Sequence, residues 1–142
     1  MKDKSIMIQI AHRGLSQEMK DNSKEAFQEA IRRGFEMIEL DIQLSKDNLI
    51  FIYHDTYIDR FLLKDLDFRD ILKLDEDIML FRDFLFFIKS YSIKIYLDMK
   101  GYGEKICDIL PGILDECLEP SYIYEYIYIA SFNIKQIGRA HV

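Results

Sequence analysis

The sequence has few cysteines and no concentration of basic residues. The spacing of its two cysteines, Cys107 and Cys117, is typical neither of a zinc site nor of a redox pair, so we interpret them as free thiols in a reducing compartment. The formal net charge is -6 and the isoelectric point is near 5.1. Because no basic cluster is interleaved with aromatic residues, nucleic acid is not expected as a partner.

Long apolar runs, linkers and internal repeats are also missing. The first residues, Met-Lys-Asp-Lys-Ser, lead into only a short apolar stretch. This predicts no secretory signal and no transmembrane segment, and we expect a cytoplasmic protein. The 142 residues, of which 49% are apolar and 31% charged, predict one globular domain with a buried core. The oligomeric state stays open.

The central segment Met37–Arg60 predicts an antiparallel hairpin. Two apolar, β-branched stretches flank the polar turn 45–48, and a connection this short cannot join two parallel strands. Glu39 and Asp41 are two residues apart, so both carboxylates point to one face of a strand. Position 41 should lie opposite roughly position 53, which brings His54 beside Asp41. The alternative is a plain hairpin with a solvated polar face.

The preceding segment predicts a strand, a loop and a helix. Ser5–Ala11 is a nearly continuous apolar run, typical of a strand that is buried on both faces. His12 and Arg13 follow at its carboxyl end, where parallel α/β folds carry their chemistry, although a histidine that only caps a strand is the alternative. A helix should begin with an N-cap within 22–25 and end at Gly34. With the next strand this makes a βαβ unit.

The second half of the chain predicts further strands and helices. Phe61–Met79 is mixed and acidic, which favours an irregular, solvated segment with one helical turn rather than a calcium site. The elements expected after it are a helix over Leu80–Ser90, a strand over Lys94–Met99, a helix over Glu104–Leu118 and a strand over Tyr126–Ala130. The tyrosines just before the last strand, Tyr122, Tyr124 and Tyr126, are interpreted as packing and edge residues.

Four strands with polar residues at their carboxyl ends fit two architectures. One is a small doubly wound α/β domain. The other is the first half of an eight-stranded barrel, which normally needs roughly 250 residues. The hydrophobic periodicity does not choose between them.

A compound pattern of short motifs covers about the first sixty residues. In order, the motifs are Ala11-His12-Arg13-Gly14, Asp21-Asn22-Ser23 with Ala26-Phe27 and Ala30, Gly34, Ile38-Glu39-Leu40-Asp41-Ile42, Lys46-Asp47, His54-Asp55 and Asp59-Arg60. This pattern resembles the glycerophosphodiester phosphodiesterase family, and the later Leu97-Asp98-Met99-Lys100 and Ala130-Ser131-Phe132 are similar to its third and fourth strands. The resemblance implies an α/β fold, a TIM-type (β/α)8 barrel represented here by roughly its first half, with a β-hairpin insertion after strand 2. It also implies hydrolysis of glycerophosphodiesters, such as glycerophosphocholine, to glycerol 3-phosphate and an alcohol.

The resemblance further implies a role for each candidate site residue. His12 and His54 would be the acid/base pair, Arg13 and Lys100 would hold the phosphate, and Glu39, Asp41 and Asp98 would bind one divalent cation. Three carboxylates make a hard oxygen site suited to Mg²⁺ or Ca²⁺. Two imidazoles can share the proton transfers because imidazole titrates near neutral pH. Without the cation the acids should repel, so at least one pKa should be raised.

Two departures from the family pattern affect this interpretation. Lys20-Asp21 stand where the family usually has Pro-Glu, and Asp98 is one methylene shorter than the usual Glu. An Asp-x-Lys at this place also resembles sphingomyelinase D-type phosphodiesterases, which are one alternative. The other alternative is a non-catalytic α/β domain whose acids bind a structural metal or only solvent. A phosphodiesterase requires the acids to gather around a common point.

The last residues follow a different pattern. Residues 136–142, Gln-Ile-Gly-Arg-Ala-His-Val, fit neither a strand nor a helix and match the in-frame translation of a common sequencing-adapter sequence. We therefore expect residues 1–135 to form the N-terminal half of a barrel and residues 136–142 to be a non-native tail, in which His141 has no function. A half barrel lacks substrate-binding loops, so such a chain can be inactive even if its parent is an enzyme.

Overall fold

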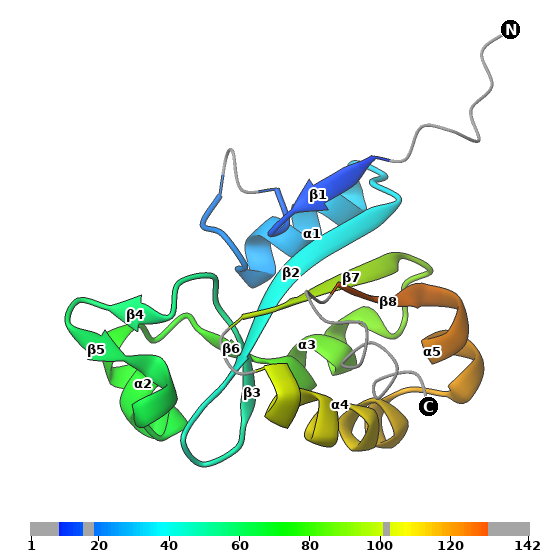
Figure 1. Cartoon of the computed structure of the whole chain (residues 1–142). Coiled ribbons are helices and arrows are strands. Elements are labelled where there is room, and N and C mark those ends of the chain that lie inside the picture. The colour runs from blue at the N-terminus through cyan, green and yellow to red at the C-terminus, as the bar shows by residue number, and fades with distance from the viewer. Residues whose placement is uncertain (1–8, 16–18, 101–102, 131–142) are drawn as a thin grey trace, which may run out of the picture.

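The computed structural model describes residues 9–15, 19–100 and 103–130 (Figure 1). The first elements in order are β1 (Ile10–His12), α1 (Lys24–Arg32), β2 (Met37–Leu44), β3 (Ile50–Ile52), β4 (Tyr57–Ile58), β5 (Phe61–Leu62) and the 3₁₀ helix η2 (Leu63–Asp65). They are followed by α2 (Phe68–Leu74), β6 (Met79–Leu80), α3 (Phe81–Ile88), β7 (Lys94–Met99), α4 (Gly103–Cys117), α5 (Pro120–Tyr126) and β8 (Ile127–Ala130).

The main sheet is organised around β2, which has different neighbours along its two halves. On one side β7 runs parallel to β2 over Met37–Ile42, and β8 pairs in parallel with β7. On the other side β1 is parallel to β2 at Met37–Glu39, and β3 returns antiparallel along Ile42–Leu44. β6 pairs with β3. The four parallel strands and the hairpin agree with the sequence predictions.

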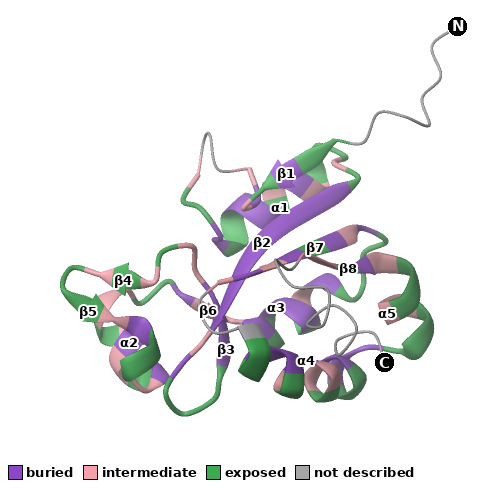
Figure 2. Ribbon diagram, in the orientation of Figure 1, coloured by how far each residue is buried: buried purple, intermediate pink, exposed green. Residues whose placement is uncertain are grey.

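The two faces of β2 and β7 carry different side chains. On one face Ile38 and Leu40 of β2 lie beside Ile95 and Leu97 of β7, and all four belong to the main hydrophobic core. That core also contains Phe27 and Ala30 of α1, Phe81, Phe84, Leu85 and Ile88 of α3, and Ile106, Cys107 and Leu110 of α4. Because side chains alternate along a strand, the acids of β2 project from the opposite face. Figure 2 shows β2 buried along nearly its whole length.

Helix α1 begins and packs as its sequence predicts. Ser23 is its N-cap, and the hydroxyl accepts a hydrogen bond from the Ala26 backbone amide at 3.1 Å. Phe27 of α1 meets Phe84 of α3 edge to face, with ring centroids 4.9 Å apart. Both rings are fully buried. Burial of each such side chain contributes about 1.5–3 kcal/mol, so this contact fixes α1, and with it the loop before α1, against the sheet.

The segment Phe61–Met79 is more regular than predicted. It forms β5, η2, α2 and the start of β6, and its residues Leu63, Phe68, Ile71 and Ile78 make a second small hydrophobic core with Phe51 of β3. These apolar residues cover Phe51, which points away from the main core, and they alternate with acids along the chain. The acidic composition of this segment therefore did not indicate that it folds into a unit beside the hairpin (Figure 1).

Two other predictions need correction in part. Tyr122, Tyr124 and Tyr126 belong to α5, which Pro120 opens at its first position. The predicted packing role holds for Tyr122, which packs against the main core and whose ring contacts that of Tyr126, but not for Tyr124, which is 93% exposed. Ile10 of β1 is 51% exposed, because β1 pairs only with β2 among the described residues and forms an edge there. The expected tail 136–142 lies outside the described residues.

Two further features concern the whole described chain. Cys107 and Cys117 are both buried on α4 as free thiols. Among the described residues, no helix combines the length and the apolar character that crossing a membrane requires.

Candidate active site

Three acids from two neighbouring strands meet at the carboxyl edge of the sheet. Glu39 and Asp41 lie on β2, and Asp98 lies on β7 directly opposite Asp41 in the parallel register. One oxygen from each side chain lies within 4.8 Å of the others. Asp41 is fully buried and Glu39 is 8% exposed. The strands thus gather the acids around a common point, as a phosphodiesterase requires.

The donor set fits a hard divalent cation. Oε1 of Glu39 and Oδ1 of Asp41 are buried and have no hydrogen-bond partner among the described residues. A buried acceptor left without a partner costs about 1–3 kcal/mol. Carboxylate oxygens are the ligands that Mg²⁺ and Ca²⁺ prefer, and a cation between these side chains would satisfy both orphaned atoms.

The acids affect one another's protonation. Burial, together with the negative charges of Asp41 and Asp98, raises the pKa of Glu39 from 4.5 to about 7. The sequence-based expectation that one of the clustered acids has a raised pKa is therefore confirmed. Near neutral pH, Glu39 is therefore present in both its protonated and its ionised form.

Two cations flank the acids. Nε of Arg13 lies 3.3 Å from Oδ2 of Asp41, and its Nη1 donates to Oδ2 of Asp21 at 2.9 Å. Nζ of Lys100 lies 2.9 Å from Oδ2 of Asp98 and 3.6 Å from Oδ1 of Asp41. Burial lowers the pKa of both cations, but the hydrogen bonds to Asp21 and Asp98 and the surrounding acids outweigh it, so both pKa values are raised. Both side chains therefore stay charged.

The first histidine lies next to the acids. His12 ends β1 opposite Glu39 in the register, and its Nε2 is 3.6 Å from Oε2 of Glu39. Its side chain is 62% exposed, so it is open to a ligand above the sheet. This arrangement places a proton donor or acceptor at the edge of the acid cluster.

The second histidine lies at the end of the returning strand. The backbone amide of Tyr53 donates to the carbonyl of Asp41 at 3.0 Å, which confirms the predicted register of the hairpin. Nδ1 of the next residue, His54, lies 2.8 Å from Oδ1 of Asp55. The buried Gln43 donates to the carbonyls of Tyr53 and Asp55 at 2.8 and 2.7 Å. Gln43 therefore fixes the backbone on both sides of His54.

Sequence reasoning assigned no site role to Asn22, Asp21 and Gln43. Asn22 is 3% exposed, and its Nδ2 donates to Oδ2 of Asp41 at 3.1 Å. Its backbone has a φ of 57°, in the left-handed region that asparagine tolerates better than most residues. The available signal was the Asp-Asn pair within the family-like motif, which indicated its presence but not its contact.

The loop that carries Asn22 is tied down at both ends. The Asn22 amide donates to the Arg13 carbonyl at 2.8 Å, and the Leu15 amide donates to the Ala26 carbonyl at 3.0 Å. Nζ of Lys20 donates to both carboxylate oxygens of Asp75 at 2.8 Å. Lys20, which stands at a departure from the family pattern, thus links this loop to the chain just after α2.

Comparison with known proteins agrees with this arrangement. The sequence model of the glycerophosphoryl diester phosphodiesterase family matches residues 12–107. Human glycerophosphodiester phosphodiesterase 1 is 28% identical over 153 residues, covering 90% of this chain and 46% of that protein. Glycerophosphodiester phosphodiesterase of Caldanaerobacter subterraneus is 40% identical over 74 residues, covering 49% of this chain and 30% of that protein. The chain spans about half the length, or less, of these curated relatives.

Solved structures show the same fold. Glycerophosphodiester phosphodiesterase of Thermotoga maritima matches with a TM-score of 0.76 and 22% identity, covering 95% of this chain and 58% of that one. A phosphodiesterase of Oleispira antarctica, solved in complex with the product sn-glycerol-3-phosphate, matches with a TM-score of 0.78 and 21% identity, covering 94% and 61%. The strands described above are therefore part of a TIM-type barrel and not a doubly wound sheet. From the family match over residues 12–107 and this shared fold, the chain belongs to the glycerophosphoryl diester phosphodiesterase family.

Proposed function

We propose that this chain contributes the cation-binding, phosphate-binding and acid–base residues of an enzyme that hydrolyses glycerophosphodiesters to glycerol 3-phosphate and an alcohol. The observation that carries the proposal is the acid cluster, in which two buried carboxylate oxygens have no hydrogen-bond partner among the described residues and two cationic side chains lie close by. The product complex of the Oleispira antarctica relative supports the choice of substrate class.

Glu39, Asp41 and Asp98 would hold one divalent cation, Mg²⁺ or Ca²⁺. When bound, the cation supplies positive charge that polarises a phosphoryl oxygen and neutralises charge that builds up in the transition state. Asn22 fixes the Asp41 carboxylate through its Nδ2, so the most buried of the three ligands is held in one orientation.

Arg13 and Lys100 would bind the phosphate. A diester phosphorus carries a negative charge that repels nucleophiles, and fixed cations aimed at its oxygens stabilise the transition state. Asp21 and Asp98 hold the two cations by hydrogen bonds of 2.9 Å each. Preorganised in this way, the guanidinium and the ammonium need little rearrangement when the substrate arrives.

His12 and His54 would divide the proton transfers. With Nδ1 of His54 donating to Asp55, Nε2 keeps its lone pair and can accept a proton from the attacking water or glycerol hydroxyl. Nε2 of His12 lies 3.6 Å from Oε2 of Glu39, at the edge of the acid cluster. We assign His54 as the base and His12 as the acid that protonates the leaving alkoxide.

The test is the release of glycerol 3-phosphate from glycerophosphocholine by a full-length protein that carries this chain, with Mg²⁺ present. His12→Ala and His54→Ala should each lower kcat about 100-fold or more, because positioned acid–base catalysis contributes that much. Far-UV circular dichroism and Tm should stay unchanged. Asp115→Asn, at an exposed acid on α4, is the control and should keep full activity. Full activity in either site variant would overturn the assignment.

A further inference from the structure

The pairing of β2 with β3 changes where the hairpin reaches the acid cluster. Regular pairing ends at Ile42 and Ile52. One position further along, the Tyr53 amide donates to the Asp41 carbonyl at 3.0 Å, but the Asp41 amide donates to Oδ1 of Asn22 at 3.4 Å. In a regular antiparallel pair the Asp41 amide would donate to the Tyr53 carbonyl instead. The Tyr53 carbonyl therefore loses its usual donor from the backbone of β2.

The side chain of Gln43 replaces that donor. Gln43 lies two residues after Asp41 on β2, so its side chain projects from the same face of the strand. Its Nε2 donates to the carbonyls of Tyr53 and Asp55 at 2.8 and 2.7 Å. A carboxamide nitrogen has two N–H groups, one for each carbonyl, whereas the carboxamide oxygen can donate to neither. The two contacts therefore also fix which way round the amide lies.

His54 lies between the two carbonyls that Gln43 holds. Nδ1 of His54 is 2.8 Å from Oδ1 of Asp55, but the Asp55 side chain is 69% exposed. An exposed pair of this kind is weak and gives the imidazole little fixed orientation by itself. Gln43, in contrast, is 4% exposed and lies on a strand that is buried along nearly its whole length. The firm support for His54 therefore comes from the backbone on its two sides.

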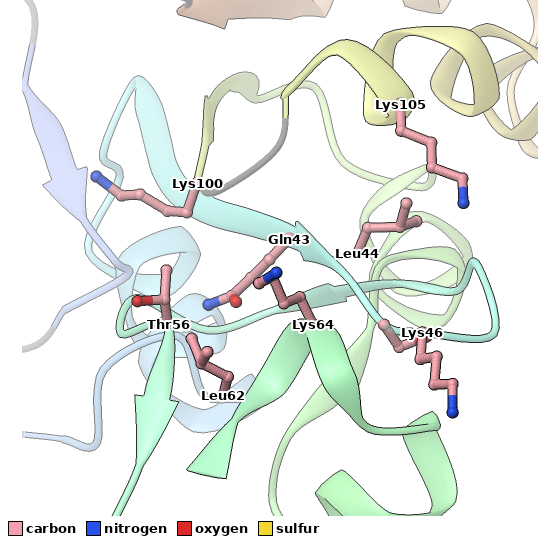
Figure 3. A pocket seen from close by; sticks show the side chains of 9 residues that line it. Gln43, Leu44, Lys46, Thr56, Leu62, Lys64, Lys100 and Lys105 are labelled. Atoms are coloured by element: carbon pink, nitrogen blue, oxygen red, sulfur yellow. The ribbon is translucent and has the colours of Figure 1, made fainter. Parts of the chain in front are cut away.

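Gln43 also lines a hollow of about 600 Å³. In Figure 3 its side chain extends from β2 toward Thr56, the residue after Asp55. Because Gln43 and Thr56 both line the hollow, water in it can hydrate the two carbonyls when the amide is replaced. Such water does not hold a peptide group in one orientation. A variant without the amide should therefore fold but leave His54 less firmly placed.

We propose that Gln43 is a positioning residue for His54, acting through the carbonyls on its two sides. The proposal rests on the proposed function, in which His54 accepts a proton from the nucleophile. A general base must lie within hydrogen-bond reach of that proton, so a small displacement of the imidazole lowers kcat. Substrate binding is assigned to other residues, so KM should change little.

The test is the hydrolysis of glycerophosphocholine by a full-length protein that carries this chain, with Mg²⁺ present. Gln43→Met keeps a side chain of similar length but has no donor, so kcat should fall about 10- to 100-fold while KM and Tm change little. Gln43→Asn keeps the amide on a side chain one methylene shorter and should give an intermediate loss of kcat. Gln28→Met, at an exposed glutamine on α1, is the matched control and should keep full activity.

The same substitution in a protein without His54 separates positioning from a general structural effect. A residue that acts through His54 has nothing left to position once that imidazole is gone. Gln43→Met should therefore not lower the residual rate of His54→Ala any further. Unchanged kcat in Gln43→Met alone, or a second loss of similar size in the His54→Ala protein, would overturn the proposal.

A spectroscopic measurement keeps this proposal separate from the hydrolytic function. If the unmodified protein hydrolyses no glycerophosphodiester, the proposed function fails, and the tautomer of His54 then tests the positioning by itself. Two-bond ¹H–¹⁵N spectra at about pH 8, where imidazole is neutral, should show the proton on Nδ1 in the unmodified protein. In Gln43→Met the proton should be distributed over both ring nitrogens. The same tautomer population in both proteins would overturn the positioning role, whatever the outcome with the substrate.

Discussion

Asn22 holds Asp41 through both ends of its side-chain amide. Its Nδ2 donates to Oδ2 of Asp41 at 3.1 Å, and its Oδ1 accepts from the backbone amide of Asp41 at 3.4 Å. Both residues are buried, and 19 positions separate them in the sequence. The loop after β1 is thereby connected to the middle of β2, at the residue that anchors the acid cluster.

Replacing Asn22 by alanine should destabilise the protein by about 3 kcal/mol. The buried carboxylate loses a donor, and alanine must adopt a left-handed φ. Urea unfolding without divalent cations measures the loss. Asn48→Ala is the matched control, because Asn48 also has a positive φ of 64° but is exposed, and it should cost only about 1 kcal/mol. Equal losses in the two variants would mean that the contact with Asp41 contributes nothing.

Divalent cations should stabilise the folded protein. A ligand that binds only the folded state adds about 2.7 kcal/mol at a concentration 100 times its Kd. The increase in unfolding free energy with Mg²⁺ or Ca²⁺ should disappear in Asp98→Asn, because this removes one member of the acid cluster. Asp115→Asn changes an exposed acid on α4 and should leave the increase intact. No increase in the unmodified protein would contradict a cation site at these residues.

Without divalent cations, stability should fall as the pH rises from 4.5 to about 7. The folded-state pKa of Glu39 is raised to about 7, so across this window the folded state binds more protons than the unfolded state. At about 1.4 kcal/mol per pH unit the loss is at most about 3 kcal/mol. Glu39→Gln should flatten this slope, as measured by urea unfolding at several pH values.

Glu29→Gln is the control for this pH effect. Hydrogen bonds from Arg32 lower the pKa of Glu29 to about 2, so its contribution is lost only as the pH falls toward that value. The variant should therefore keep the slope between pH 4.5 and 7. A slope that persists in Glu39→Gln would assign the effect to another group.

Gly14 should tolerate a side chain less well than Gly34. Both have a positive φ, of 75° and 78°. A Cβ at Gly14 would come within 2.8 Å of the backbone and the Cβ of Ala26, whereas a Cβ at Gly34 meets nothing within 4 Å. Gly34→Ala should cost about 1–2 kcal/mol for its φ alone, and Gly14→Ala about 1–3 kcal/mol more. Thermal unfolding compares the two variants, and similar Tm values would show that the contact with Ala26 is not tight.

The elements that were predicted correctly have strong local signals. The strand over Lys94–Met99 has the predicted bounds, because apolar residues alternate along it and polar residues follow. The hairpin register was predictable because a four-residue turn leaves little freedom in how two strands pair. The motif residues on β1, β2 and β7 then indicated which side chains come together at one edge of the sheet.

The elements that were missed depend on contacts between distant residues. Helix α2 forms because Phe68 and Ile71 pack against Phe51, and nothing in their own segment indicates that partner. The role of Asn22 likewise depends on a positive φ and on a strand 19 residues away, neither of which has a local signal. The link from Lys20 to Asp75 spans 55 residues. Such contacts appear only once the chain is folded.

Apolar and acidic side chains alternate along β2 and lie on its two opposite faces. Ile38, Leu40 and Ile42 belong to the main core, while Glu39 and Asp41 belong to the acid cluster proposed to bind the cation, and none of these five side chains belongs to both. An apolar residue of β2 can therefore be exchanged for another of similar volume without changing any member of the acid cluster.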